Sequence, residues 1–386
     1  MVAYTFYETD NRVMRYAEAL AARGDQVDVL SLQHVGHEPV EKINGVTVRR
    51  IQKRALNEKG KFSYLTRMLA FFSRSSWFLT KKTFTGPYDL IHVHSVPDFE
   101  VFSALIPKLC GTKVILDVHD IVPEFYAAKF GVEKESIILR LLKLIERWSS
   151  AFSDHVIISN HLWEKLITAR SVRAEKCSTC LNYPDSKIFR PGMRTRNGDG
   201  RFIMVYPGTI NWHQGLDVAV KAFDIIKDQA PEAEFHIYGD GNARTQLAQL
   251  IEERSLQNRI KLMGLVPIRQ MASIMANADL GIVPKRNDPF GGSAFSTKIF
   301  EFMALGVPII AANTVIDTFY FNDSLVKFFQ AGDEHSLAHA MLTMMNQPSL
   351  RKELAENAST YIAHQAWDIK RDDYFKLIDK LIGKKE

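Results

Sequence analysis

Short runs of β-branched and aromatic residues alternate along the chain with longer segments in which apolar residues recur at helical spacing. In the first half, these runs predict strands near residues 2–7, 26–31, 46–51, 89–94, 112–118 and 155–160. Helical patterns separate them, for example at 12–23 and 136–151. Strands that alternate with helices are typical of parallel sheets covered by helices. The first half is therefore predicted to form an α/β domain.

A segment rich in Pro, Gly and Asn at residues 182–200 interrupts this alternation. The alternation then restarts, with strands predicted near residues 202–207, 234–239, 259–263, 279–284 and 307–311. We therefore expect two doubly wound α/β domains, at residues 1–184 and 201–364, that face each other across a cleft lined by the loops after their strands. A final helix, within residues 365–386, is expected to pack back onto the first domain.

The length and composition limit the number of domains and indicate the cellular compartment. With 386 residues, 46% hydrophobic and 24% charged, the chain suits an ordinary globular protein of two or three domains. Three cysteines make no disulfide framework, and the motif formed by Cys177 and Cys180 has neither a second pair nor a nearby His, so no metal site is expected. No apolar stretch approaches the roughly 18 residues that a membrane-spanning helix needs. The first residues have the pattern of a strand, without the basic start and apolar core of a signal peptide. A cytoplasmic protein is predicted, soluble or peripherally bound to a membrane.

The formal net charge of +5 is unevenly distributed. Residues 42–82 contain eleven Lys and Arg and one acidic residue, Glu58, a balance of +10, so the rest of the chain is net −5. Within this segment, residues 61–82 form a helical pattern whose broad apolar and aromatic half is edged by Arg67, Arg74 and Lys81. Such a helix suits an anionic membrane surface, whereas the alternative is a crossover helix packed on the sheet. The aromatic density argues against nucleic acid as the partner.

Two glycine-containing loops follow strands of the second half. Gly208 ends the strand at 202–207, and Gly215 precedes a helical pattern, so free backbone N–H groups at a helix start could hold phosphate. Gly239 lies in a second glycine turn after the next strand. The alternative interpretation is that glycine is simply what turns between strands and helices require.

The segment at residues 288–310 carries the most chemistry. A Gly-rich loop leads into a helix whose first turn holds Ser296, Thr297 and Lys298, and whose next turn holds Glu301. Hydroxyls and amides at a helix start can bind a diphosphate, Lys298 supplies a cation, and Glu301 can accept hydrogen bonds from sugar or ribose hydroxyls. The alternative is an ordinary capped helix with solvated charges.

The order of three motifs resembles a known family. The motifs G-T-x-x-x-x-Q-G-L-D, Y-G-D-G and S-T-K-x-x-E-F-M-A-x-G-V-P-I-I are similar to the nucleotide-sugar half of retaining family 4 glycosyltransferases. The segment ILDVHDIVPEFY at 115–126 resembles the acceptor-side His loop of that family. The resemblance implies the GT-B fold, an α/β architecture of two facing Rossmann-like domains with a C-terminal return helix.

The resemblance also assigns residues on the donor side. Glu301 matches the second glutamate of the family's E-x(7)-E motif and would bind the donor ribose, whereas Ser293 stands where the first glutamate would be. The family's two phosphate-binding cations correspond to Thr209 and Gln214, so Lys298, and after it Lys285 and Arg286, are the expected replacements. The expected donor-binding residues are Gly208, Thr209, Asn211, His213, Gln214, Gly215, Gly239, Val266, Lys285, Gly292, Ser293, Ala294, Phe295, Ser296 and Thr297.

The implied reaction is same-face attack, in which the leaving phosphate accepts the proton of the acceptor hydroxyl. His119 would orient the donor sugar or that hydroxyl, which makes His119, Lys298 and Glu301 the expected catalytic residues. Asp120 and Glu124 are expected acceptor contacts. Arg12 either joins them or is an ordinary residue at a helix start. Neither a metal nor a cofactor is expected beyond the sugar nucleotide.

The predicted function is retaining transfer of a hexosyl or N-acetylhexosaminyl group from a UDP- or GDP-linked sugar to a glycan or lipid-linked glycan of a bacterial surface polysaccharide. The expected location is the cytoplasmic face of the membrane, with residues 61–82 against an anionic surface. Two alternatives remain on the same fold: a sugar-nucleotide epimerase, and a scaffold that binds a sugar nucleotide without catalysis.

Overall fold

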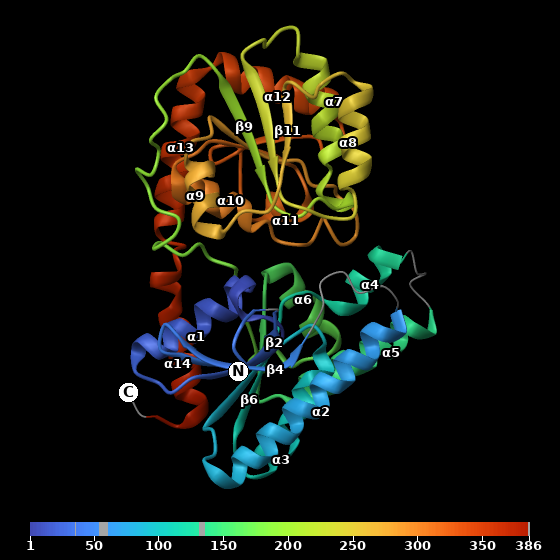
Figure 1. The fold of residues 1–386 in the computed structure, drawn as a ribbon, viewed down its shortest axis with the longest axis vertical. Helices are drawn as coiled ribbons and strands as arrows, with labels where there is room; N and C mark the ends of the chain where they lie inside the picture. Colours follow the sequence, from blue (N-terminus) through green and yellow to red (C-terminus); the bar gives the residue numbers. More distant parts are fainter. Residues whose placement is uncertain (35, 54–60, 131–135, 385–386) are drawn as a thin grey trace. The chain divides into compact units, whose positions relative to one another are not determined.

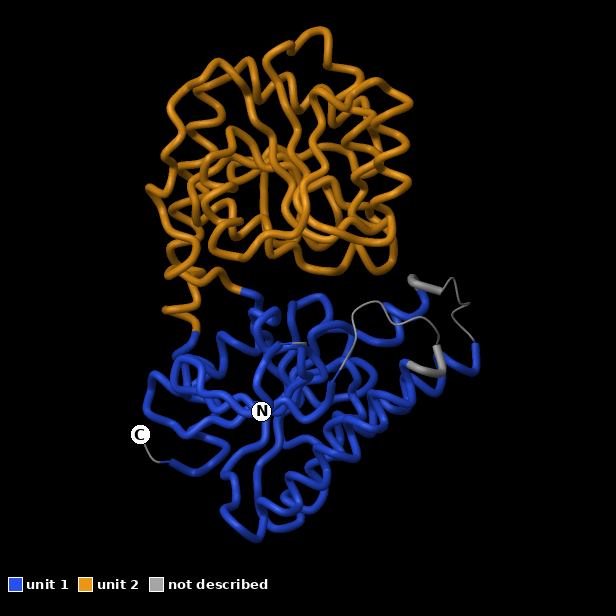
Figure 2. The backbone as a smooth tube through the Cα atoms, viewed as in Figure 1, with its two compact units in different colours: residues 1–182, 371–386 blue, residues 183–370 orange. Residues whose placement is uncertain are grey.

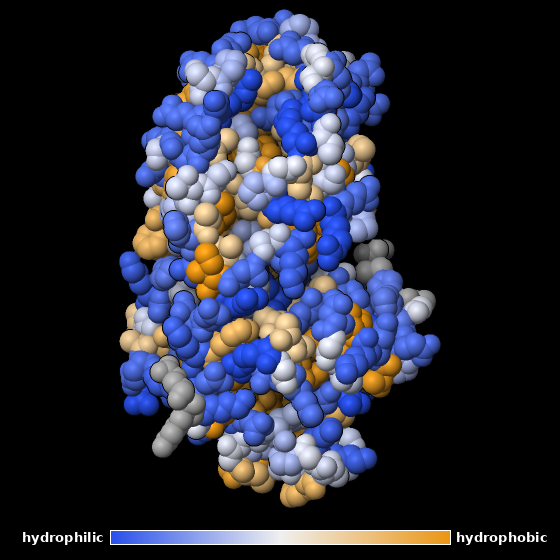
Figure 3. Space-filling view, turned by 90° about the vertical axis from the view of Figure 1, so that its left-hand side faces the viewer, coloured by the Kyte–Doolittle hydropathy of each residue, from blue (hydrophilic) through white to orange (hydrophobic). Residues whose placement is uncertain are grey.

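The computed structural model describes residues 1–34, 36–53, 61–130 and 136–384. The chain divides into two compact units, which are shown in different colours in Figure 2. The first unit contains residues 1–182 and 371–386, and the second contains residues 183–370. Hydrophilic side chains make up most of the surface drawn in Figure 3, with hydrophobic ones in small groups.

The first unit is built on an eight-stranded sheet with the order β3-β4-β2-β1-β5-β6-β7-β8. Neighbouring strands are parallel except for the antiparallel pair β3 and β4. The strands are β1 (Val2–Phe6), β2 (Asp28–Gln33), β3 (Val40–Ile43), β4 (Val46–Lys53), β5 (Leu90–His94), β6 (Lys113–Val118), β7 (His155–Ile158) and β8 (Cys177–Thr179).

Helices cover this sheet, as Figure 1 shows. They are η1 (Tyr7–Thr9), α1 (Asn11–Arg23), α2 (Lys61–Thr85), η2 (Asp98–Ala104), α3 (Leu105–Leu109), α4 (Val122–Phe130), α5 (Ile137–Phe152), α6 (His161–Arg170) and η3 (Ala174–Lys176). The Asp10 side chain caps α1 by accepting hydrogen bonds from the amides of Arg12 and Val13. Helix α14 (Trp367–Ile382) enters the first unit at residue 371, and its Tyr374 and Ile378 are buried there.

The second unit contains a six-stranded parallel sheet with the order β11-β10-β9-β12-β13-β14. Its strands are β9 (Phe202–Pro207), β10 (Ala233–Tyr238), β11 (Ile260–Met263), β12 (Leu280–Val283), β13 (Ile309–Ala312) and β14 (Lys327–Phe329). Its helices are η4 (Trp212–Gln214), α7 (Leu216–Ile226), α8 (Arg244–Glu253), α9 (Ile268–Ala276), α10 (Thr297–Leu305), α11 (Val315–Tyr320), α12 (Glu334–Asn346) and α13 (Pro348–Ala363). The chain order reverses between β9 and β12, where open α/β sheets place ligands beyond the carboxyl ends of the strands.

The α/β class predicted from the sequence is confirmed, with two parallel sheets wrapped by helices. The structure divides the chain at Asn182, so residues 183–200 belong to the second unit. Arg194 and Arg196 hold this segment there through ion pairs with Asp279. Among the described residues, no helix combines the length and hydropathy that crossing a membrane requires.

Candidate active site

Four loops of the second unit lie at one edge of its sheet because all its strands are parallel. The expected donor-binding residues follow β9 (Gly208, Thr209, Asn211, His213, Gln214, Gly215), β10 (Gly239), β11 (Val266) and β12 (Lys285 and residues 292–297). The structure therefore brings all of them to the carboxyl edge of this sheet.

Glycine residues allow the loops that follow β9 and β10 to lie in direct backbone contact. Gly239 has φ +138°, and a Cβ atom on it would lie 1.9 Å from the carbonyl oxygen of Gly208. Gly208 has φ +136°, and a Cβ atom there would lie 2.5 Å from Cε of Lys298. Backbone at these angles favours glycine, and both contacts are shorter than a side chain tolerates. Because Gly208 has no side chain, the Lys298 side chain can pack directly on the loop that follows β9.

Lys298 lies in the first turn of α10 and reaches across to the β9 loop. Its Nζ donates to Oε1 of Gln214 at 3.4 Å and lies 5.4 Å from the ring centre of Tyr206. The Tyr206 hydroxyl lies 2.8 Å from the carbonyl oxygen of Thr209, which fixes the loop beneath the ammonium. Burial lowers the pKa of Lys298 to about 8, an effect that Glu301 opposes and Lys285 reinforces.

Backbone donors lie beside this cation at the start of α10. The amides of Gly292, Ser293 and Ala294 donate to carbonyl oxygens within their own loop, so they are not the free donors that the glycines suggested. The amides of Phe295 and Ser296 have no acceptor among the described residues. Two backbone N–H groups and an ammonium at a helix start are a suitable site for an anion.

Lys285 does not supply a second open cation, contrary to the expectation. Its side chain is buried, its Nζ donates to the carbonyl oxygen of Ala294 at 2.7 Å, and it pairs with Asp317 at 3.0 Å. Arg286 likewise donates to both oxygens of Asp217. Both cations therefore hold loops of the site in place. These partners are 32 and 69 residues away in sequence, which is why the local pattern did not indicate them.

In the first unit, His119 directly follows β6 and lies in a cluster centred on the buried Asp117. Nε2 of His119 lies 3.2 Å from Oδ2 of Asp117 and 3.1 Å from Nδ1 of His94. Burial by itself would raise the pKa of Asp117, but the charges of Arg12 and His119 hold that pKa well below its usual range. An ionised Asp117 therefore orients the imidazole of His119.

Arg12 belongs to this cluster and is engaged by Asp117, a partner that neither interpretation of the sequence expected. Its Nε and Nη2 donate to the two oxygens of Asp117 at 2.8 and 2.7 Å, and its Nη1 donates to Cys180 and Asn182. The guanidinium is buried, with 4% of the side chain exposed. Arg12 thus neutralises Asp117 and ties α1 to β6.

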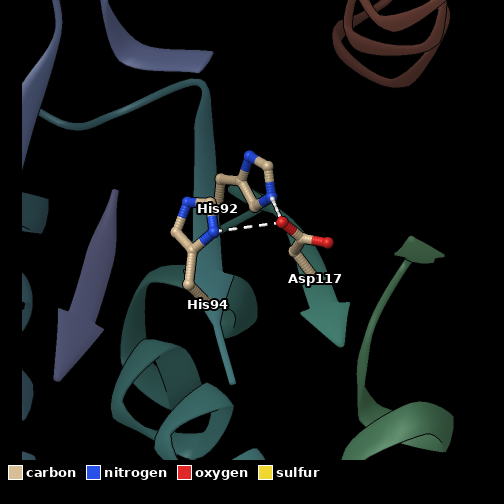
Figure 4. A group of neighbouring side chains, drawn as sticks. All are labelled: His92, His94 and Asp117. Carbon is tan, nitrogen blue, oxygen red and sulfur yellow. Dashed lines mark hydrogen bonds and ion pairs between the residues drawn. The ribbon is translucent and has the colours of Figure 1, made fainter. Parts of the chain in front are cut away.

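His92, His94 and Asp117 form the centre of the cluster (Figure 4). The two imidazole rings stack with centroids 4.2 Å apart, and Nδ1 of His92 lies 2.8 Å from the hydroxyl of Tyr374 on α14. Burial lowers the pKa of both histidines, so they are neutral at neutral pH. These residues were not predicted from the sequence, although His at alternate positions of an otherwise apolar strand, I-H-V-H, was a visible signal.

The same three residues are close enough together to bind a metal ion, but the charges do not fit one. Arg12 already neutralises Asp117, and the two histidines are neutral. A divalent cation would therefore add two uncompensated charges to a buried site, which is strongly unfavourable. We assign the cluster to hydrogen bonding around His119.

The two other expected acceptor residues differ in their surroundings. Asp120 follows His119, and burial raises the pKa of its carboxyl while His119 opposes the shift. Glu124 accepts hydrogen bonds from Arg170 on both oxygens, and Arg170 also pairs with Glu146 of α5. Glu124 therefore ties α4 to α5 and α6 through Arg170, and its contact with an acceptor stays a prediction.

Comparison with known proteins identifies the chain. Residues 9–182 match the family model for a glycosyl transferase 4-like domain, and residues 194–361 match that for glycosyl transferases group 1. The chain belongs to the family 4 glycosyltransferases. The resemblance seen in the sequence motifs is thereby confirmed.

Relatives of this glycosyltransferase act on different substrates. It is 23% identical to the D-inositol 3-phosphate glycosyltransferase of Thermomonospora curvata, over 97% of this chain and 90% of the relative. It is 21% identical to the phosphatidyl-myo-inositol mannosyltransferase of Propionibacterium freudenreichii, over 74% of this chain and 68% of the relative.

Solved structures show that the glycosyltransferase has the GT-B fold. Sucrose-phosphate synthase from Thermosynechococcus elongatus matches with a TM-score of 0.80 at 18% identity, over 100% of this chain and 99% of that one. Anabaena Alr3699/HepE in complex with UDP-glucose matches with a TM-score of 0.72 at 16% identity, over 99% and 97%.

Proposed function

We propose that this glycosyltransferase moves a hexosyl or N-acetylhexosaminyl group, with retention, from a UDP- or GDP-linked sugar to a glycan or lipid-linked glycan of a surface polysaccharide. The observation that carries the proposal is the anion site formed by Lys298 and the amides of Phe295 and Ser296 against the Gly208 loop. A nucleoside diphosphate is the anion that suits it, and the structural relative HepE binds UDP-glucose.

The proposed reaction requires the protein to stabilise the charge that develops as the donor breaks. Breaking the bond between sugar and phosphate leaves negative charge on the diphosphate, and fixed donors at that point lower the barrier. Lys298 and the α10 amides supply these donors, while Glu301, one turn further along α10, accepts hydrogen bonds from ribose hydroxyls. Ser293 offers no carboxylate nucleophile, so the acceptor oxygen attacks on the face that the phosphate leaves, and the phosphate takes its proton. His119, oriented by Asp117, positions the reacting hydroxyl or the donor sugar.

Donor binding and stereochemistry test this function together. Thermal unfolding of the full chain is measured with a panel of UDP- and GDP-linked sugars, because a ligand that binds the folded state raises the melting temperature. We expect one nucleotide class to stabilise the protein and the anomeric NMR signals of the product to show the configuration of the donor. Inversion would contradict retention. Conversion of the donor without any acceptor would indicate an epimerase, and no stabilisation by any sugar nucleotide would indicate a scaffold without catalysis.

The pH dependence of UDP binding follows from the pKa of Lys298. The ammonium is charged below its pKa of about 8 and is lost as the pH rises through that value. We therefore expect the dissociation constant of UDP to be steady below pH 8 and to rise above it, by at most about ten-fold per pH unit for one proton. Calorimetric titrations across this range measure the slope. The Lys298→Gln variant should show weaker binding without this slope, and a slope that persists in it would exclude Lys298 as its source.

We further propose that the first unit docks on the cytoplasmic face of an anionic membrane. Helix α2 packs Met68, Phe71 and Leu79 into the core, as the crossover interpretation expected, yet 74% of Trp77 is exposed. The side chains of residues 61–63, and Arg54, Glu58 and Lys59 of the basic segment, lie outside the described residues.

The exposed apolar side chains extend beyond α2. Helices α2 and α5 both pack against η2, and α3 packs against α2 (Figure 1). All three expose apolar side chains: Leu65, Leu69, Trp77 and Phe84 on α2, Leu105, Ile106 and Leu109 on α3, and Ile137, Ile138, Leu141, Leu144 and Trp148 on α5. Basic residues lie among them, including Arg140, Lys143 and Arg147 of α5. Apolar side chains interspersed with cations are suited to an anionic bilayer surface.

A further inference from the structure

An exposed indole ring lies on the loop that follows β9 in the second unit. It belongs to Trp212, the first residue of η4, and the residue is 63% exposed. The guanidinium of Arg286 lies over the ring, with its central carbon 3.8 Å from the ring centre. Because most of the side chain stays exposed with one face covered, the opposite face of the indole is open within the second unit.

Arg286 holds the indole in one orientation because it is itself fixed. Its Nη2 donates to both carboxylate oxygens of Asp217 on α7, at 2.7 and 2.6 Å. Its Nε donates to the carbonyl oxygen of Trp212 at 3.2 Å, and its backbone amide donates to that of His213 at 2.9 Å. A surface that is already ordered loses little conformational entropy when a ligand binds to it. We call Trp212, held by Arg286, the indole platform.

A small cavity of about 70 Å³ opens beside the indole platform, between α7 and α8, which pack together (Figure 1). It is larger than the about 30 Å³ that one water molecule takes up, so it suits a hydroxyl or hydroxymethyl group. Its lining combines apolar side chains with two amides and one carboxylate. The lining residues are Ile210, Asn211, Trp212, Leu216, Asp217, Ala243, Gln246, Leu247 and Leu250.

The side-chain amides of Asn211 and Gln246 give this cavity its hydrogen-bonding character. Each amide can both donate and accept hydrogen bonds, as a hydroxyl group can. Asp217 is the one charged residue of the lining, and its carboxylate is balanced by Arg286. The cavity therefore suits a neutral ligand that carries hydroxyl groups.

A pyranose ring matches the indole platform and the cavity together. One face of such a ring presents C–H groups, whose partial positive charge suits the negative face of an aromatic ring. Its hydroxyls lie around the edge of the ring, and the amides of Asn211 and Gln246 lie beside the indole. The apolar residues Leu216 and Leu247 of the cavity are buried, so the indole is not part of an exposed apolar cluster like those on α2, α3 and α5.

The indole platform lies close to the anion site of the proposed function. Trp212 and Gln214 are two residues apart, so their Cα atoms lie within about 7 Å of each other. Oε1 of Gln214 in turn accepts a hydrogen bond from Nζ of Lys298 at 3.4 Å. A sugar on Trp212 can therefore belong to a substrate that reacts at a diphosphate held by Lys298.

We propose that Trp212 is the stacking surface for a pyranose ring of a sugar substrate, with a hydroxyl or hydroxymethyl group of that ring in the cavity beside it. The ring is supplied by the donor sugar or by the acceptor glycan. This inference rests on the proposed function and extends it, because it assigns selection of the sugar to a residue separate from the groups that hold the diphosphate.

The experiment compares two variants of the full chain with a matched control. Trp212→Ala removes the aromatic face, whereas Trp212→Tyr keeps one. The control is Ile225→Ala, which removes an exposed apolar side chain near the other end of α7. Calorimetry measures the dissociation constants of UDP, GDP, UDP-glucose, UDP-N-acetylglucosamine and GDP-mannose. The methyl glycosides of glucose, mannose and galactose are then titrated with UDP or GDP present.

Tryptophan fluorescence reports contact with the indole directly. The chain has five tryptophans, so the difference between the wild type and Trp212→Tyr isolates the signal of Trp212. We expect a sugar nucleotide or a methyl glycoside to quench this signal, and free UDP and GDP to leave it unchanged.

We expect Trp212→Ala to weaken binding of one sugar ligand by about ten-fold, the size of effect of losing one stacked aromatic contact. Trp212→Tyr should restore most of the affinity, and Ile225→Ala should have no effect. The dissociation constant of the free nucleoside diphosphate should be equal in all variants. A loss confined to a sugar nucleotide assigns the donor sugar, and a loss confined to a methyl glycoside assigns the acceptor.

Three results would overturn the inference. Unchanged affinity for every sugar ligand would show that the platform is not used. An equal loss of affinity for the free nucleoside diphosphate would show that Trp212 only supports its loop. Quenching by UDP or GDP alone would place the nucleotide base on the indole.

Failure of the proposed function gives a different result. If no sugar nucleotide stabilises even the wild type, the proposed function fails. The methyl glycosides then test the platform alone: quenching of Trp212 supports a site for a pyranose, and its absence overturns that site. If a sugar nucleotide stabilises the wild type and all three variants equally, and no methyl glycoside quenches Trp212, the proposed function stands and the inference fails.

Discussion

Replacing Lys298 with Gln is expected to lower kcat/KM for glycosyl transfer by about 100-fold or more, the size of effect seen when a fixed donor to developing negative charge is removed. Lys285 and Arg286 are already committed to Asp317 and Asp217. Neither can therefore replace the lost ammonium at the diphosphate without breaking its own ion pair. Most of the loss should appear in kcat, because the charge on the leaving group is greatest in the transition state.

Steady-state kinetics with a saturating acceptor measure this effect. The matched control is Lys352→Gln, which removes a highly exposed lysine of α13 in the same unit and should leave transfer unchanged. A Lys298→Gln enzyme with nearly full kcat would show that the diphosphate is neutralised elsewhere, and the assignment of the anion site at α10 would fail.

Replacing Arg12 with Met is expected to destabilise the first unit by about 3–5 kcal/mol, because removing one partner of a buried ion pair leaves the other charge uncompensated. Asp117 is fully buried and would lose both hydrogen bonds from the guanidinium. His119, whose Nε2 lies 3.2 Å from Asp117, would lose the fixed position of its partner, so its orientation should change as well. Transfer activity is therefore expected to fall together with stability.

Denaturant unfolding followed by a probe in the first unit tests this prediction. Arg23→Met, at the other end of α1, removes a guanidinium from partly exposed pairs with Asp25 and Asp379 and should lower stability by about 1 kcal/mol or less. Adding Asp117→Asn to Arg12→Met should restore part of the loss by removing the buried charge. If Arg12→Met and Arg23→Met lower stability equally, the buried pair is not the strong constraint described above.

The sequence predicted the longer elements because their patterns are local. Alternating strands and helices set the α/β class, and the order of the motifs placed the loops that we expect to bind the donor after β9, β10 and β12. The short strands β3, β8 and β14 were missed. β3 is a four-residue edge strand whose side chains are mostly exposed, so it carries no apolar alternation that could reveal it.

The partners of the site's charged residues could not be predicted for a different reason. Arg12 and Asp117 are 105 residues apart, and Arg170 and Glu124 are 46 apart. A charged residue reads the same in a sequence whether it faces a substrate or a buried partner. Only the packing of distant elements decides between the two, so the ion pairs of Arg12 and Glu124 could not be predicted. The position of Lys298 depends on its own helix, and Lys298 lies at the expected edge of its sheet.

The return of α14 to the first unit bears on the order in which the protein is made. The second unit is one continuous stretch, residues 183–370, and can fold as soon as it has left the ribosome. The first unit is synthesised earlier, yet it lacks Tyr374 and Ile378 until residues 371–386 emerge. Until then, His92 has no phenol hydroxyl at its Nδ1 and the surface that α14 covers is open to water. The half of the enzyme that begins first during translation is therefore completed last.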